Sequence, residues 1–159
     1  MGHYPIIQLS KFDNEDAITT EDFKNNGKYS WFINDGHADF VHYAHSPDDV
    51  ENLFEYALNR SGIQYDKEKR TVTIIDKEEY FKRKYERFIE TAKSISDWSL
   101  KHFVDGNIDT EMYRLNTSVE DKVDTYICID DRIQSMDAFI RGCNNGESYK
   151  VIFGIMYHI

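Results

Sequence analysis

Histidines and carboxylates are the residues of this sequence whose types and spacing could bind a metal ion. His37, Asp39 and His45 are separated by even numbers of residues, and such residues share one face of an extended strand. Imidazole and carboxylate groups suit zinc, iron or manganese. However, His37 and His45 would lie about 26 Å apart on a straight strand. His37 and Asp39 remain as a weak two-ligand pair, and solvated strand residues are the better interpretation.

A second acidic set lies where expected strands end. Asp130 and Asp131 follow the apolar run 125–129, and Asp76 follows another β-rich run. Carboxylates in such positions can hold Mg²⁺ for phosphoryl chemistry, which keeps a small metal-dependent hydrolase as one hypothesis. The simpler interpretation is that Asp76 caps a helix and that Asp130 and Asp131 form a turn.

Motifs for other kinds of chemistry do not occur in the sequence. It contains neither a G-x-S-x-G elbow nor the glycine-rich motifs of nucleotide sites, so we expect no cofactor and no enzymatic activity. Two cysteines, Cys128 and Cys143, are too few for a disulfide-dependent domain. Because residues 1–9 hold too brief an apolar run for a secretion signal and no run approaches a membrane span, we expect a cytoplasmic protein.

Charge is the most distinctive property of the chain. The 29 acidic and 19 basic residues give a net charge of −10, which disfavours direct binding to nucleic acid. A basic middle segment carries Lys82, Arg83, Lys84, Arg87, Lys93 and Lys101. Acidic residues four positions before Lys82, Arg83 and Lys101 indicate an ordinary solvated helix face rather than a phosphate-binding surface.

The acidic residues gather in three groups that could imitate a row of phosphates and bind a basic protein. We expect partner binding at these groups, although acidity that serves only solubility is the alternative. The groups are Asp13, Glu15, Asp16, Glu21 and Asp22; Asp48, Asp49, Glu51 and Glu55; and Glu120, Asp121, Asp124, Asp130 and Asp131.

The elements that would position these residues follow from hydrophobic periodicity and turn signals. We predict a single α+β domain over residues 1–159, with a mainly antiparallel sheet built from hairpins and packed against one long and one or two shorter helices. Expected strands cover 3–9, 28–33, 37–45, 63–65, 70–75, 112–115, 125–129 and a central strand at 149–158. We expect 28–33 and 37–45 to form a tight hairpin through Asn34, Asp35 and Gly36. We expect a brief helix that ends at residue 23, and further helices at 47–60, 77–102 and 136–141.

In general character the chain resembles the small inhibitors that phages and mobile elements use against host nucleases, such as anti-CRISPR and anti-restriction proteins. This likeness is one of type and rests on no shared motif. It implies an inhibitor of a basic nucleic-acid-binding protein, with Trp31 or Tyr43 as aromatic contacts where exposed. An immunity protein or antitoxin that neutralises a toxin is the alternative. No pattern predicts the oligomeric state.

Overall fold

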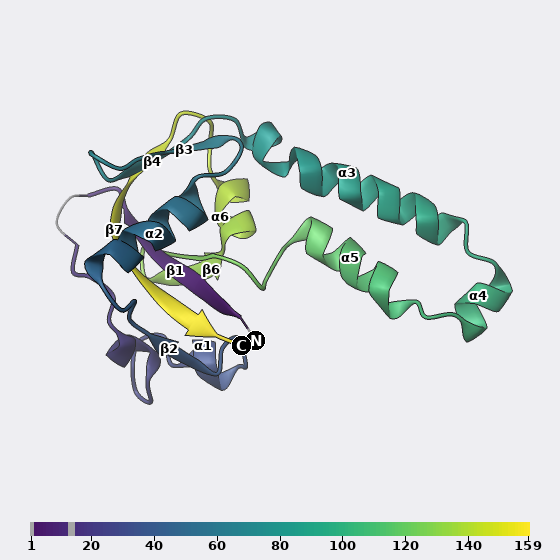
Figure 1. The fold of residues 1–159 in the computed structure, drawn as a ribbon, viewed down its shortest axis with the longest axis horizontal. Helices are drawn as coiled ribbons and strands as arrows, with labels where there is room; N and C mark the ends of the chain where they lie inside the picture. The colour runs from purple at the N-terminus through teal and green to yellow at the C-terminus, as the bar shows by residue number, and fades with distance from the viewer. Residues whose placement is uncertain (1, 13–14) are drawn as a thin grey trace.

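The computed structural model describes residues 2–12 and 15–159 and shows a mixed sheet from which a helical hairpin projects (Figure 1). In chain order the elements are β1 (His3–Ser10), the 3-10 helix η1 (Thr20–Phe23), α1 (Trp31–Asn34), β2 (Phe40–His42), α2 (Pro47–Leu58), β3 (Ile63–Asp66), β4 (Thr71–Ile74), α3 (Lys77–Ser96), α4 (Leu100–Asp105), α5 (Asp109–Val119), β5 (Tyr126–Ile129), β6 (Arg132–Ser135), α6 (Met136–Gly142) and β7 (Ser148–His158).

The sheet confirms the predicted α+β class. Its seven strands run in the order β3-β4-β7-β1-β5-β6, with β2 also paired to β7. All of these pairs are antiparallel except β1 with β5. The strand β7 therefore lies in the centre of the sheet, as its largely apolar sequence predicts.

Both faces of the sheet are buried. Phe54 and Leu58 of α2 and Ile140 of α6 pack on one face, where they meet Ile7 and Ile127. The other face is covered by residues 18–38, which bring Phe23, Tyr29 and Phe32 against Tyr126 and Tyr157. Because successive strand side chains point to opposite faces, β5 supplies Tyr126 and Cys128 to one layer and Ile127 and Ile129 to the other.

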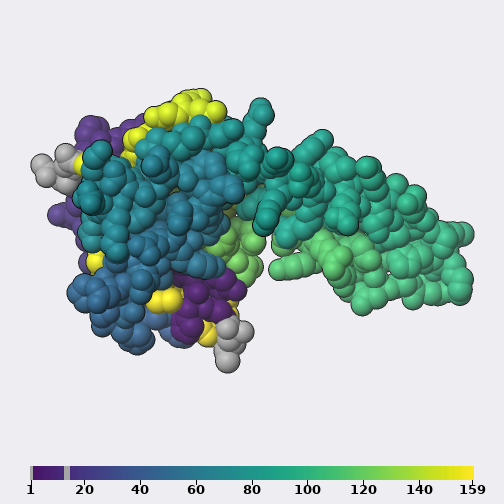
Figure 2. Space-filling view, turned by 45° about the horizontal axis from the view of Figure 1, so that its top comes forward, coloured from purple at the N-terminus to yellow at the C-terminus, as the bar shows by residue number. Residues whose placement is uncertain are grey.

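The helices α3, α4 and α5, residues 77–119, form what we call the arm. The chain leaves the sheet along α3, turns at α4 and returns along α5 (Figure 1). In the space-filling view the arm projects from the rest of the molecule as a teal-to-green extension (Figure 2). Among the described residues, no helix has both the length and the apolarity needed to cross a membrane.

Gly62 fixes the point where the arm leaves the sheet. Its φ is +77°, and a Cβ at this position would lie 2.1 Å from the carbonyl oxygen of Asp76. The Gly62 carbonyl also accepts hydrogen bonds from the Ile75 and Asp76 amides, each at 2.9 Å. Glycine is required here both for the left-handed conformation and for the close approach of the two segments.

Three predictions of local structure are wrong. The expected strands 28–33 and 37–45 do not pair as a hairpin. Residues 28–33 are a turn and the short helix α1, since Tyr29 and Phe32 enter the core together at helical spacing, and only Phe40–His42 of the second segment is a strand, paired with β7. The predicted helix 77–102 ends at Ser96, and Ser99 caps the separate helix α4 by accepting a hydrogen bond from the His102 amide at 3.0 Å.

The third wrong prediction is the strand 112–115, which lies inside α5. Apolar residues recur in and around this segment at steps of three and four positions. Only a helix places residues with that spacing on one side. The residues are Ile108, Met112, Leu115 and Val119. The helix α5 returns beside α3 (Figure 1), and of these residues Ile108 and Leu115 are half-buried, whereas Met112 and Val119 are exposed.

Candidate functional site: an acidic pocket and the base of the arm

Two acidic segments that are far apart in the sequence meet at one pocket. Glu15, Asp16 and Asp22 line it from the segment after β1, and Asp131 lines it from the β5–β6 turn. The pocket has a volume of about 360 Å³ and includes one cation, Lys28, which forms an ion pair with Asp131. We call this hollow the acidic pocket. It joins members of the first and third predicted acidic groups.

The turn at Asp130 and Asp131 explains how the third group reaches this pocket. Both residues have positive φ, +50° and +60°, which is the geometry of a two-residue hairpin turn between β5 and β6. Aspartate tolerates this conformation better than most side chains. The turn interpretation of these two residues is therefore confirmed.

Five of the predicted binding carboxylates already have an ion-pair partner within the chain. Two of these pairs, Glu21 with Lys24 and Asp131 with Lys28, lie near the acidic pocket. The others are Glu51 with Arg70, Glu55 with Lys67, and Asp124 with Arg60. These carboxylates would have to exchange one cation for another on binding a basic partner. Asp13 lies outside the described residues.

The Asp124–Arg60 pair is the most buried of the five. Two guanidinium nitrogens of Arg60 donate to the two carboxylate oxygens at 2.6 and 2.9 Å, and both side chains are about four-fifths buried. Burial alone would raise the pKa of Asp124, but the Arg60 hydrogen bonds and charge outweigh it and hold the pKa below its ordinary value. This pair stabilises the fold rather than offering a free carboxylate.

The structure separates the proposed metal ligands. His37 stacks on Phe32 with ring centroids 5.5 Å apart, whereas Asp39 lies 3.3 Å from His158. Asp76 caps α3 by accepting hydrogen bonds from the Glu78 and Glu79 amides. Asp76 follows β4 while Asp130 and Asp131 follow β5, with β7 and β1 between these strands. Within residues 2–12 and 15–159, no group of three potential ligands is placed to hold a metal ion.

A cluster of four histidines was not predicted. Nδ1 of His3 lies 3.0 Å from Nε2 of His42, and the His3 ring also contacts His158. His45 lies beside His42. The pKa of His3 is lowered from 6.5 by desolvation and by the charges of His158, His42 and His45. Only strand pairing brings residues 3, 42 and 158 together, so no spacing along the sequence could have indicated the cluster.

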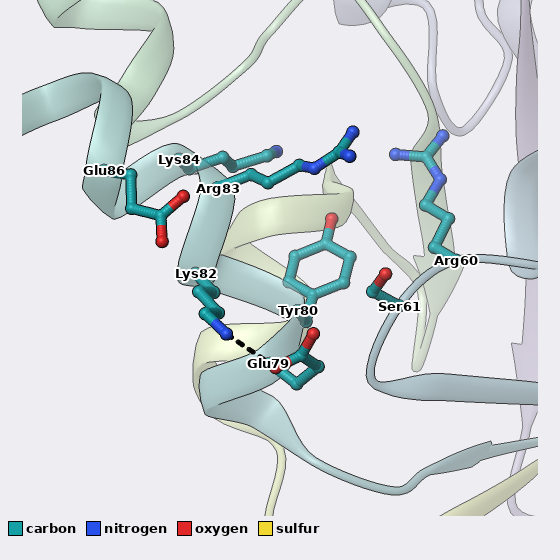
Figure 3. A pocket seen from close by; sticks show the side chains of 8 residues that line it. All are labelled: Arg60, Ser61, Glu79, Tyr80, Lys82, Arg83, Lys84 and Glu86. Carbon is teal, nitrogen blue, oxygen red and sulfur yellow. Dashed lines mark ion pairs between the residues drawn. The ribbon is translucent and has the colours of Figure 1, made fainter.

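A second pocket, of about 560 Å³, lies where the arm joins the sheet (Figure 3). Figure 3 shows Arg60 and Arg83 pointing toward each other from opposite sides of this pocket. Its lining residues are Arg60, Ser61, Glu79, Tyr80, Lys82, Arg83, Lys84 and Glu86. Three of its four cations are engaged by carboxylates: Arg60 by Asp124, Lys82 by Glu79 and Lys84 by Asp137.

Asp137 of α6 connects the arm to the sheet. It is 1% exposed and accepts hydrogen bonds from the Tyr80 hydroxyl and from the Asp121 amide, each at 2.8 Å, and from Lys84. Tyr80 and Lys84 belong to α3, while Asp121 follows α5. Desolvation and the negative charge of Asp137 raise the pKa of Tyr80, so its hydroxyl remains a donor. We interpret this second pocket as a structural junction because its charges are used internally.

Comparisons with protein-family models, with curated proteins and with solved structures found no match to this chain. The geometry of the chain itself therefore carries the functional argument.

Proposed function

We propose that this protein is a small acidic inhibitor that binds a basic nucleic-acid-binding protein, such as a CRISPR or restriction nuclease, through the acidic pocket. The supporting observation is the meeting of Glu15, Asp16 and Asp22 with the β5–β6 turn at one hollow. Carboxylates held on a rigid support can occupy the cationic groove that a nuclease uses for phosphate groups.

The distribution of charge along the chain also favours the acidic pocket as the binding surface. The arm contains eight acidic and eight basic residues, so the net charge of −10 belongs entirely to the remainder of the chain. A basic partner would therefore be attracted toward the sheet side of the molecule, where long-range attraction accelerates association. Phe12, which is 75% exposed beside this segment, provides apolar contact area next to the carboxylates.

The test is inhibition of DNA cleavage by a panel of purified RNA-guided and restriction nucleases. We compare the wild type with a pocket variant, Glu15→Gln with Asp16→Asn. The matched control is Asp48→Asn with Glu68→Gln, which removes the same number of exposed charges at a distance from the acidic pocket. At low salt we expect the pocket variant to need about tenfold more protein for half inhibition, since two charge contacts of about 0.7 kcal/mol each are lost.

Raising the salt from about 50 to about 300 mM should weaken wild-type inhibition, because screening shortens the range of the attraction. The control variant should match the wild type. The proposal is wrong if no nuclease of the panel is inhibited, or if the control loses as much inhibition as the pocket variant.

A further inference from the structure

The arm exposes apolar surface along both of its helices. One stripe on α3 comprises Phe81, Phe88, Ala92 and Ile95, and one on α5 comprises Ile108, Met112, Leu115 and Val119. Six of these eight side chains are half-buried, whereas Met112 is 41% and Val119 is 48% exposed. Two helices bury only the seam between them, whereas a bundle of four helices encloses such stripes in a core.

The distal end of the arm carries three highly exposed apolar residues. Leu100, Phe103 and Val104 of α4 are 80%, 62% and 68% exposed. Their spacing of three and four places them on one side of the helix. A contiguous apolar patch of this kind on a soluble protein marks an interaction surface.

A hollow at the proximal end of the arm has matching chemistry. It has a volume of about 300 Å³, is lined mainly by apolar surface, and borders Tyr85, which is 64% exposed. Its lining residues are Phe81, Lys84, Tyr85, Phe88, Ser118, Val119 and Arg141. It could receive apolar side chains of the size that α4 presents.

The charges of the two ends of the arm are opposite. The proximal end, residues 77–89 and 112–119, holds six basic and three acidic residues, a net charge of +3. One of these cations, Lys84, is paired with Asp137. The distal end, residues 90–111, holds two basic and five acidic residues, a net charge of −3. Two arms side by side in opposite directions would therefore place each distal end on a proximal end of opposite charge.

We propose that a second copy of this chain covers the arm, and that two arms pair antiparallel as a symmetric four-helix bundle. The same surface then serves both copies, as a two-fold interface requires. The 20-residue helix α3 is about 30 Å long, and two adjacent helices are about 20 Å wide. The covered face is thus about 600 Å² per copy, near the lower range of stable interfaces. The antiparallel pairing keeps the parts of the two chains outside the arms, each with a net charge of −10, at opposite ends of the bundle.

Mass measurement by light scattering or sedimentation from about 1 to about 200 µM tests this proposal, since interfaces of this size are typical of weak complexes that dissociate on dilution. We expect the mass to rise from 18.8 kDa toward twice that value. The tip variant Leu100→Ser with Phe103→Ser and Val104→Thr should weaken dimerisation at least tenfold. The control Phe40→Ser with Tyr56→Ser alters exposed apolar residues outside both the arm and the acidic pocket and should dimerise like the wild type. A wild type that stays monomeric throughout overturns the proposal.

Charge reversal tests the antiparallel orientation. Lys82→Glu with Arg83→Glu changes the proximal end to −1, and Asp105→Lys with Asp109→Lys changes the distal end to +1. Each pair of changes alone should weaken the dimer, and all four together should restore it. A short thiol cross-linker acting on Lys101→Cys should fail to join the two chains, because the distal ends would lie about 30 Å apart. Efficient cross-linking would refute this orientation. Neither result depends on the acidic pocket, so the two proposals can fail separately.

Discussion

Removing the carboxylate of Asp137 should loosen the arm from the sheet. Asp137→Ala leaves Lys84, the Tyr80 hydroxyl and the Asp121 amide without their shared acceptor. Removing one member of a buried ion pair costs about 3–5 kcal/mol. The Lys84 side chain is 21% exposed and can turn toward water, so we expect a loss of about 3 kcal/mol in the free energy of unfolding.

The chain contains two tryptophans that report on its two parts. Trp98 follows α3 in the arm, and Trp31 belongs to α1 beside the sheet. Urea unfolding of Trp31→Phe and Trp98→Phe variants, followed by fluorescence, therefore separates the unfolding of the arm from that of the sheet. In the Asp137→Ala background we expect the Trp98 transition to move to lower urea than the Trp31 transition, because the lost hydrogen bonds join α3 and the segment after α5 to the sheet.

A double-mutant cycle isolates the ion pair. Asp137→Asn keeps acceptor and donor groups but no charge, and Lys84→Met keeps the apolar length of the side chain. We expect a coupling energy of at least about 1 kcal/mol between the two changes. A coupling near zero, or a loss below about 1 kcal/mol for Asp137→Ala, would refute the role of Asp137 as the junction of arm and sheet.

Three further outcomes follow from the structure. Gly62→Ala should lower the free energy of unfolding by more than Gly36→Ala, since both have φ of +77° but only at Gly62 would the new Cβ collide with backbone; chemical denaturation of both variants measures the difference. Asp130→Asn should raise the free energy of unfolding by up to about 0.5 kcal/mol in thermal denaturation, since asparagine suits the first position of this turn and Asp131 keeps its ion pair with Lys28. The free energy of unfolding should fall as the pH drops below 6.5, because the lowered pKa of His3 makes the unfolded chain bind more protons; His3→Asn should flatten this dependence in denaturation curves measured at several pH values.

Local signals in the sequence determined a large part of the fold. The spacing of Val50, Leu53, Phe54, Ala57 and Leu58 behind a serine cap specifies α2, and Ser46 accepts the expected hydrogen bond from the Asp49 amide. The hairpin β3–β4 and the apolar strand β7 also formed where their sequences predict them. These signals succeed because capping, turn chemistry and apolar periodicity depend on neighbours within a few residues.

The sequence failed where distant contacts outweigh local preference. Residues 28–33 have a β-rich composition, but the core against Tyr126 and Tyr157 accepts Tyr29 and Phe32 only at helical spacing. Residues 112–115 were ambiguous because a short apolar run fits either a strand or a helix. Packing of α5 against α3 decides the matter, since it half-buries Leu115 and buries Ser118, which accepts a hydrogen bond from Arg87 of α3 at 2.9 Å.

Amino-acid composition alone determined the charge of the chain, its capacity for a core and the kinds of residue available for binding. Tertiary structure decided which of those residues meet. The pairing of β1 with β5 and of β5 with β6 brings the turn at 130–131 beside residues 15–22. Likewise, only the path of α3 and α5 away from the sheet separates a neutral arm from an acidic remainder. Charge is a property that a sequence states directly, whereas proximity between distant residues arises only when burial of apolar surface folds the chain.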